Sequence, residues 1–178
     1  MSAFLLIAAL VLCLAGGWVQ AKEYLTQPQA LREAFPSYQV ERKTLFLTPA
    51  QGAQVKQLAG TKADSLIYSY YVARSTAGVA GVAFFDKRIV RSMPVTYMVV
   101  VNPAGSVQYV DVLAFDEPED FFPPARWLAL YKNRALGSDM AIGRGIPHIT
   151  GASLTSQAMN DGIRLILAIY QVGVKGTV

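Results

Sequence analysis

The sequence predicts an α+β protein, in which helices pack against an antiparallel β-sheet. Three observations support this class. The middle of the chain is rich in β-branched and aromatic residues arranged in strand-length runs. Two short segments that each begin with a candidate Thr N-cap lie before the middle of the chain, and the last third contains one strong amphipathic helix. Strands gathered in one region and helices in others indicate a sheet with helices packed on it.

The first elements of the predicted domain are two short helices with a strand between them. Residues 26–35 (TQPQALREAF) begin with Thr26 as an N-cap and end before Pro36. Residues 38–47 alternate in polarity and contain β-branched and aromatic residues, which is typical of a strand. Residues 48–60 start with Thr-Pro and end with Gly, which predicts a second short helix.

The middle of the chain is expected to supply most of the sheet. Strand-like runs occupy residues 65–74, 79–90 and 95–115, and the Asn-Pro-Ala-Gly sequence at 102–105 suits a tight reversal. With the earlier strand, these runs predict an antiparallel sheet of about four or five strands.

The last third is expected to be helical. A helix is predicted over residues 124–132, followed by a Gly-rich loop over 135–148. Residues 154–174 have apolar side chains at helical spacing and predict a long helix that a sheet must cover.

The first 21 residues resemble a secretory signal peptide. Their side chains are uncharged, and Val-Gln-Ala at 19–21 suits cleavage after Ala21. An uncleaved membrane anchor is the alternative, because residues 3–19 are nearly long enough to span a bilayer. Both place the rest of the chain outside the cytoplasm, in a periplasmic or other extracytoplasmic space. We divide the remainder into an α/β extension, 22–78, and a second domain, 79–178.

Composition excludes several classes of site. The net charge is +4 and only 16% of residues are charged, without a Lys/Arg block, so no nucleic-acid groove is expected. Cys13 is the only cysteine and His148 the only histidine, so the mature chain lacks the ligands of a disulfide, an iron–sulfur cluster or a multi-histidine metal site. Any redox role must come from an organic cofactor.

The segment HITGASLTS, residues 148–156, has two interpretations. In the first it is a loop ending in a helix cap, with Ser153 or Thr155 accepting from backbone N–H groups and Gly151 permitting an unusual backbone angle. In the second, the same N–H groups and the helix dipole bind a phosphate, and a hydroxyl of the turn is esterified to it.

The sequence TGASLTS, residues 150–156, resembles the flavinylation motif of the bacterial FMN-binding domain family. That family includes the C subunit of the sodium-pumping NADH:quinone reductase and the G subunit of the Rnf electron-transport complex. The resemblance implies that a flavin transferase joins FMN, through its phosphate, to Ser153. The other residues that the resemblance assigns to cofactor binding in this segment are Thr150, Gly151, Ala152, Leu154 and Thr155, the last a second-choice acceptor.

The resemblance extends over roughly residues 79–172. Residues 99–122 look like the family's strand–turn–strand, which runs into a segment that contains Glu117 and borders the flavin pocket. Trp127 is a candidate for packing on the flavin ring and Arg126 for meeting its negative charge. The alternatives are a Trp that anchors its helix and an Arg that faces solvent.

The sequence departs from the family pattern at two positions. The family's Asp, which helps the transferase to recognise its target, is replaced by Pro147, and the usual acceptor Thr is Ser153. Noncovalent FMN, or loss of the flavin, are therefore alternatives to covalent attachment.

Three functions follow from these patterns. The first is an exported electron carrier with FMN, which exchanges electrons with membrane or periplasmic donor and acceptor proteins and lacks a second substrate site. The second is a binding or assembly module without flavin. The third is a hydrolase that uses His148 and Ser153. Ser153 does not lie in the Gly-x-Ser-x-Gly sequence of a nucleophile elbow, which argues against this function. Candidates without an assigned role are Arg144, Arg164 and the acidic residues Asp116, Glu119 and Asp120.

Overall fold

The computed structural model describes residues 22–178 except 62 and 64. The predicted leader, 1–21, lies outside the described residues. One antiparallel sheet has the strand order β1-β6-β5-β4-β3-β2. Its strands are β1 (Lys22–Glu23), β2 (Gln39–Phe46), β3 (Ile67–Ser75), β4 (Gly78–Ile89), β5 (Pro94–Val101) and β6 (Val107–Phe115). The predicted α+β class is confirmed, with the two-residue β1 as an additional edge strand.

The helices near the start of the chain are set by their capping residues. Helix α2 is Gln27–Ala34 and helix α3 is Pro49–Ala59. Thr48 Oγ1 accepts from the Gln51 N–H at 3.2 Å, and Gln51 Oε1 accepts from the Thr48 N–H at 2.9 Å. This reciprocal pair is a capping box, which explains why α3 begins at the predicted residue. Gly60 then ends α3 in the left-handed region, with φ of 70°.

The later helices differ in length from the sequence-based expectation. The helix predicted over 124–132 is a single α-helical turn, α4 (Ala125–Leu128), followed by a 3₁₀ turn, Ala129–Tyr131. The long helix is α5 (Ser153–Ile169), and it continues as a π-helical turn, Tyr170–Val174.

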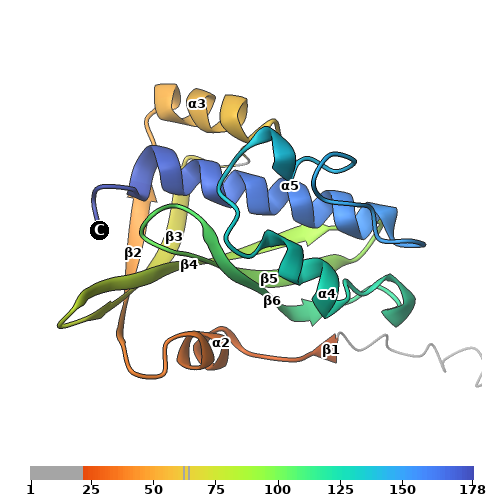
Figure 1. Cartoon of the computed structure of the whole chain (residues 1–178), viewed down its shortest axis with the longest axis horizontal. Helices are drawn as coiled ribbons and strands as arrows, with labels where there is room; N and C mark the ends of the chain where they lie inside the picture. Colours follow the sequence, from red (N-terminus) through yellow and green to blue (C-terminus); the bar gives the residue numbers. More distant parts are fainter. Residues whose placement is uncertain (1–21, 62, 64) are drawn as a thin grey trace, which may run out of the picture.

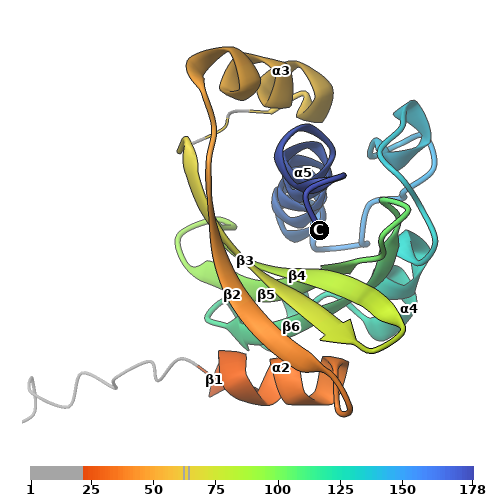
Figure 2. The same ribbon diagram turned by 90° about the vertical axis from the view of Figure 1, so that its left-hand side faces the viewer.

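Helices cover both faces of the sheet (Figures 1 and 2). Figure 2 shows α5 lying between α3 and the sheet, and α2 on the opposite face. The larger core lies under α5 and includes Tyr97, Val99, Ile163 and Leu167, all buried. A smaller core, with Phe35 and Met98, lies under α2. No helix in the described part of the chain is long and apolar enough to cross a membrane.

The sheet continues across the predicted boundary between the extension, 22–78, and the second domain, 79–178. Strands β3 and β4 pair on either side of it, with Ser75 opposite Gly78 and Val72 opposite Val82. Segment 22–78 therefore contributes three strands to the same sheet, and both segments contribute residues to the larger core.

Candidate functional site

Helix α5 begins without a side-chain cap. Its N-cap is Ala152, which is 3% exposed, and no side chain in the described part of the chain bonds the N–H groups of the first turn as a cap. Ser153 is the first helical residue and is exposed. The interpretation that Ser153 or Thr155 caps the helix is therefore wrong. Alanine is a poor N-cap, and the first N–H groups of a helix lack partners within it.

The chain reaches this helix start through a turn that needs glycine. Gly151 has φ of 80°, in the left-handed region, and a Cβ built on it would meet no atom within 4 Å. The Ala152 N–H donates to the Ile149 carbonyl at 3.0 Å, which closes the turn. Gly151 thus turns the chain and leaves open space beside the first turn of α5.

A cavity of ≈ 250 Å³ lies at this helix start. It is formed by the start of α5, the β4–β5 turn and the segment after β6. The lining residues are Val90, Arg91, Glu117, Phe121, Gly151, Ala152, Ser153, Leu154 and Thr155. The structure therefore brings Glu117 and most of the predicted motif together, while Thr150 is exposed and outside this lining.

Glu117 is buried, and one of its carboxylate oxygens binds the β4–β5 turn. Oε1 accepts from the backbone N–H groups of Arg91, Ser92 and Met93, at 3.1, 2.9 and 3.0 Å. These hydrogen bonds, first those from Ser92 and Met93, hold the pKa of Glu117 below its ordinary value. Glu117 is thus an ionised group that fixes the turn carrying Arg91.

The hydroxyl groups of the first turns of α5 differ in their partners. Thr155 is 1% exposed, and its Oγ1 has no hydrogen-bond partner in the described part of the chain. Ser156 Oγ donates to the carbonyl of Ser153 at 2.9 Å, and His148 Nδ1 lies 3.3 Å from it. Since His148 contacts the fully buried Ser156, the Ser153–His148 pair of the hydrolase hypothesis gains no support.

Trp127 anchors the loop before the motif. Trp127 is 4% exposed, and its ring packs edge-on against that of Tyr131 with the centroids 5.2 Å apart. Its Nε1 donates to the Pro147 carbonyl at 2.8 Å. Tyr131 in turn donates to Asn160 of α5 at 3.0 Å. Trp127 lies outside the cavity lining. This placement fits the alternative of an anchor for its helix rather than a platform for a flavin ring.

Replacing Trp127 by Phe is expected to lower the free energy of unfolding by about 2 kcal/mol, through the lost hydrogen bond and the smaller ring. Chemical denaturation measures this change. Arg126→Gln, at the exposed neighbouring residue, is the control and should alter stability by less than about 0.5 kcal/mol. Equal effects of the two variants would contradict the anchoring role.

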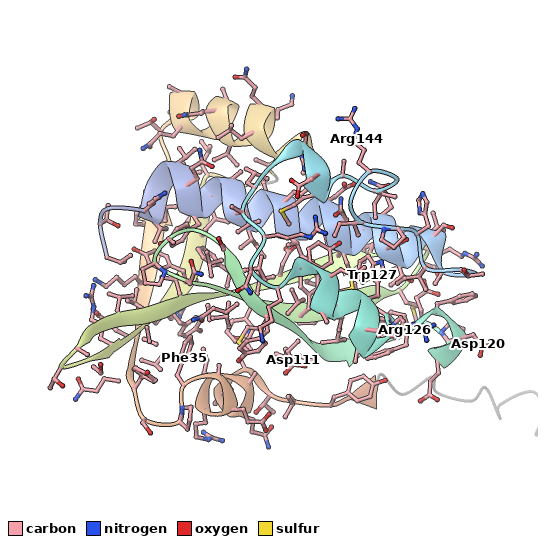
Figure 3. The ribbon with its side chains drawn as sticks, in the orientation of Figure 1. Phe35, Asp111, Asp120, Arg126, Trp127 and Arg144 are labelled. Atoms are coloured by element: carbon pink, nitrogen blue, oxygen red, sulfur yellow. The ribbon has the colours of Figure 1, made fainter. Side chains whose placement is uncertain are left out.

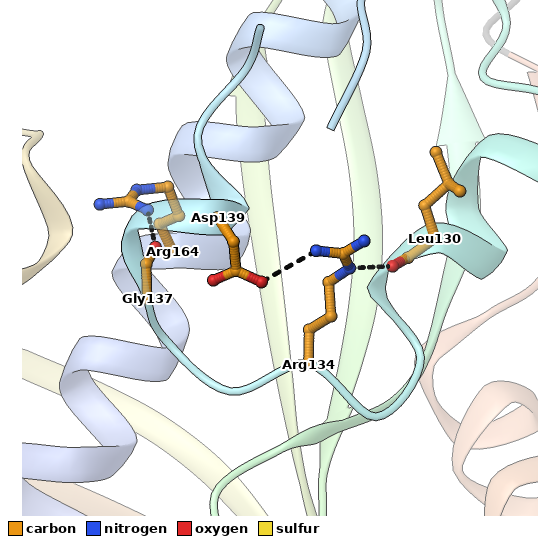
Figure 4. A network of polar contacts seen from close by, with 5 residues as sticks. All are labelled: Leu130, Arg134, Gly137, Asp139 and Arg164. Atoms are coloured by element: carbon orange, nitrogen blue, oxygen red, sulfur yellow. Dashed lines mark hydrogen bonds and ion pairs between the residues drawn. The ribbon is translucent and has the colours of Figure 1, made fainter. Parts of the chain in front are cut away.

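The basic residues without an assigned role lie away from the cavity lining. Figure 3 shows Arg144 pointing away from the body of the molecule. Arg164 donates through Nε to the Ala59 carbonyl at 3.0 Å and through Nη1 to the Gly137 carbonyl at 2.9 Å. It thus ties the end of α3 and the Gly-rich loop to α5. Figure 4 shows the contact of Arg164 with Gly137 near the ion pair of Arg134 and Asp139, whose atoms are 2.9 Å apart.

Arg91 and Phe121 are site residues that the sequence analysis missed. Arg91 lies in the β4–β5 turn, and its guanidinium carbon is 5.4 Å from the centroid of the Phe121 ring. A second cavity, of ≈ 530 Å³, shares Arg91, Glu117 and Phe121 with the first and also contains Tyr24 and Asp116. In the sequence, Arg91 is visible only as an arginine between two predicted strands. Its place in the site follows from the binding of that turn by Glu117, which the tertiary structure shows.

The acidic residues after β6 do not form a metal site. No group of three or more His, Cys, Asp or Glu side chains within the described ranges is arranged to hold a metal ion. Glu119 and Asp120 are exposed in the segment after β6, and Asp116 is partly buried.

Comparison with solved structures supports the fold. The crystal structure of Shewanella oneidensis NqrC matches with a TM-score of 0.53 and 17% sequence identity, covering 83% of this chain and 88% of that one. No protein-family model and no curated protein matches this chain. At this identity the match establishes the fold, an FMN-binding-domain-like α+β arrangement.

Proposed function

We propose that this chain is an exported flavoprotein that carries FMN as a phosphoester of Ser153 and transfers electrons in a membrane-associated or periplasmic redox chain. The proposal joins the motif's resemblance to the FMN-binding domain family with a fold like that of NqrC. The predicted leader, 1–21, supports export.

The observation that carries the proposal is the uncapped start of α5 beside a cavity. Ser153 is exposed at the first helical position, and the helix dipole adds partial positive charge there. The 17 residues of α5 are long enough to present this dipole. Uncapped N–H groups at a helix N-terminus are a common phosphate site.

The residues at the cavity fit an FMN phosphate and its chain. The Thr155 hydroxyl is buried and has no partner among the described residues, which costs about 1–3 kcal/mol unless a ligand or water supplies one. Leu154, 49% exposed, offers apolar surface beside the acceptor. The first cavity, ≈ 250 Å³, is below the usual range for a whole ligand, about 300–1,000 Å³, but the adjoining cavity provides further space.

The attachment reaction is a phosphoryl transfer. The Ser153 hydroxyl loses its proton and its Oγ forms a bond to the FMN phosphorus. With a flavin dinucleotide as donor, the pyrophosphate bond breaks and the nucleoside monophosphate leaves. The flavin transferase supplies catalysis, while this chain presents the hydroxyl and stabilises the phosphate through backbone N–H groups.

The chain's role after loading is to hold and tune a cofactor. Bound FMN supplies the redox chemistry, and the protein supplies binding, orientation and electrostatics. Its predicted partners are a redox donor and an acceptor protein. We therefore propose an electron-transfer protein or a subunit of a redox complex rather than a stand-alone enzyme.

A module of the same fold without flavin is the second candidate. Pro147 stands where the family has Asp, and its carbonyl is bonded to the buried Trp127. No carboxylate is therefore offered at that position to the transferase. Such a module would be colourless.

The decisive experiment is to express the chain with its export signal in a host that contains a flavin transferase. After denaturation, absorbance and intact mass reveal whether FMN stays attached. We expect one FMN per chain in the wild type, complete loss in Ser153→Ala, and retention in Ser153→Thr.

Thr155→Val is the matched control, because it removes the hydroxyl of the second-choice acceptor at nearly constant volume. We expect it to keep the adduct. Loss of the adduct in this variant, with retention in Ser153→Ala, would identify Thr155 as the acceptor. A wild-type protein without an adduct that also fails to bind added FMN would overturn the proposal in favour of the flavin-free module.

A further inference from the structure

Arg91 and Phe121 lie at the boundary between the two cavities. Both line the ≈ 250 Å³ cavity at the start of α5 and the ≈ 530 Å³ cavity beside it. The Arg91 guanidinium lies over the Phe121 ring, 5.4 Å from its centroid. A cation over an aromatic face is attracted by the ring quadrupole, which restricts the side chain to this boundary.

Arg91 carries the only positive charge among the described residues that line either cavity. The same two linings contain three carboxylates, those of Asp116, Glu117 and Glu119. A ligand that gains negative charge here would be repelled by these carboxylates. Among the described residues of these linings, Arg91 is therefore the side chain whose positive charge can stabilise that negative charge.

The backbone of Arg91 is fixed by Glu117. Three consecutive N–H groups, those of residues 91–93, donate to Glu117 Oε1 within 3.1 Å, and the Val90 N–H donates to the Met93 carbonyl at 3.0 Å. These hydrogen bonds hold both ends of the turn and so fix the backbone from which the Arg91 side chain extends. Glu117 is thus a positioning residue for Arg91.

We propose that Arg91, held by Phe121 and Glu117, contacts the flavin ring and raises its reduction potential. This inference rests on the proposed function, with the phosphate at the start of α5. A ribityl chain that ran from there toward the second cavity would bring the ring to the boundary that Arg91 occupies.

The physical basis is the charge change on reduction. Two electrons and one proton, supplied by a chemical reductant and water in a titration, convert the neutral oxidised ring to a reduced ring with one negative charge. A guanidinium beside the ring stabilises the charged form through Coulomb attraction, which is strong where water is partly excluded. Removing that cation should therefore favour the oxidised flavin.

The test is the midpoint potential of the flavin-loaded full chain, measured with dithionite and redox mediators. We expect Arg91→Gln to bind reduced flavin, relative to oxidised flavin, about tenfold less tightly, which lowers the potential by about 30 mV for a two-electron couple. Arg144→Gln removes an exposed arginine outside both linings and should leave the potential unchanged.

A second variant separates positioning from charge. Phe121→Leu keeps every charge but removes the aromatic face beneath Arg91, so it should lower the potential by less than Arg91→Gln does. The double variant should match Arg91→Gln alone, because both changes act through one contact. Additive shifts would contradict the positioning by Phe121.

The outcomes distinguish this inference from the proposed function. An attached flavin with the same potential in wild type and Arg91→Gln would overturn only the role of Arg91. Loss of flavin attachment in Arg91→Gln, with unchanged melting temperature, would assign Arg91 to the loading step and also overturn it. If the wild type neither carries FMN nor binds added FMN, both proposals fall.

Discussion

Replacing Gly162 by alanine should destabilise the protein by about 3 kcal/mol, although alanine is normally the better helix former by about 1 kcal/mol. Gly162 lies in α5 where the helix crosses a polar cluster of the sheet. A Cβ at this position would overlap the Tyr97 hydroxyl and the Asp86 carboxylate, and would lie 3.0 Å from Arg88 Nε. Helix α5 must then move away from the sheet or the cluster must break.

The cluster beneath Gly162 has little freedom to adapt. Asp86 Oδ2 accepts from the Tyr97 hydroxyl and from Arg88 Nε, each at 2.7 Å. Burial, reinforced by the Asp86 charge, raises the pKa of Tyr97 well above its usual value, so the phenol remains a donor. Displacing α5 would leave the buried Tyr97 hydroxyl and its partly buried partners poorly paired and open the core.

Urea denaturation with a second glycine as control tests this prediction. Gly52 lies in α3, and a Cβ there would meet only the Leu66 side chain, which is 41% exposed. Gly52→Ala should therefore be neutral or stabilising. Tyr97→Phe should recover part of the loss when combined with Gly162→Ala. Similar stabilities for Gly162→Ala and the wild type would show that α5 does not pack as described.

The elements predicted well from the sequence are those whose determinants are local. Helix α3 begins at Thr48-Pro49 and ends at Gly60 because a capping box and a left-handed residue lie within the segment itself. The helix predicted over 124–132 was too long. Trp127 and Tyr131 are both buried there, and the chain turns at Asn133 with φ of 63°, so tertiary packing limits the helix to one turn. The two-residue β1 carries too little periodicity to be recognised.

Only the part of the candidate site whose residues are neighbours in the sequence could be predicted. The motif at 150–155 could be found because its residues are neighbours in the chain. Arg91 and Phe121 reach the cavity through the pairing of β4, β5 and β6, which no local pattern encodes. Glu117 was assigned to the pocket border by resemblance, and it lines the cavity. Its hydrogen bonds to the β4–β5 turn required the tertiary structure.

Replacing Glu117 by alanine should lower the free energy of unfolding at neutral pH by about 2 kcal/mol, because three backbone N–H groups lose a charged acceptor. The pKa of Glu117 is lower in the folded state than its ordinary value of 4.5. The stabilisation by the Glu117 carboxylate is therefore fully present above the pKa that Glu117 has in the unfolded chain. It is lost as the pH falls through the lower pKa that Glu117 has in the folded protein. The difference between wild type and Glu117→Ala should shrink over that acidic window.

Denaturation curves recorded from neutral pH down to strongly acidic pH test this dependence. Glu117→Gln is the matched variant, since its amide oxygen can still accept but cannot titrate. It should lose less stability than Glu117→Ala at neutral pH, and its difference from alanine should not vary with pH. Glu119→Gln, at an exposed carboxylate in the same segment, controls for general charge effects. A wild-type advantage over Glu117→Ala that persists unchanged in acid would mean that the turn is not held by the ionised carboxylate.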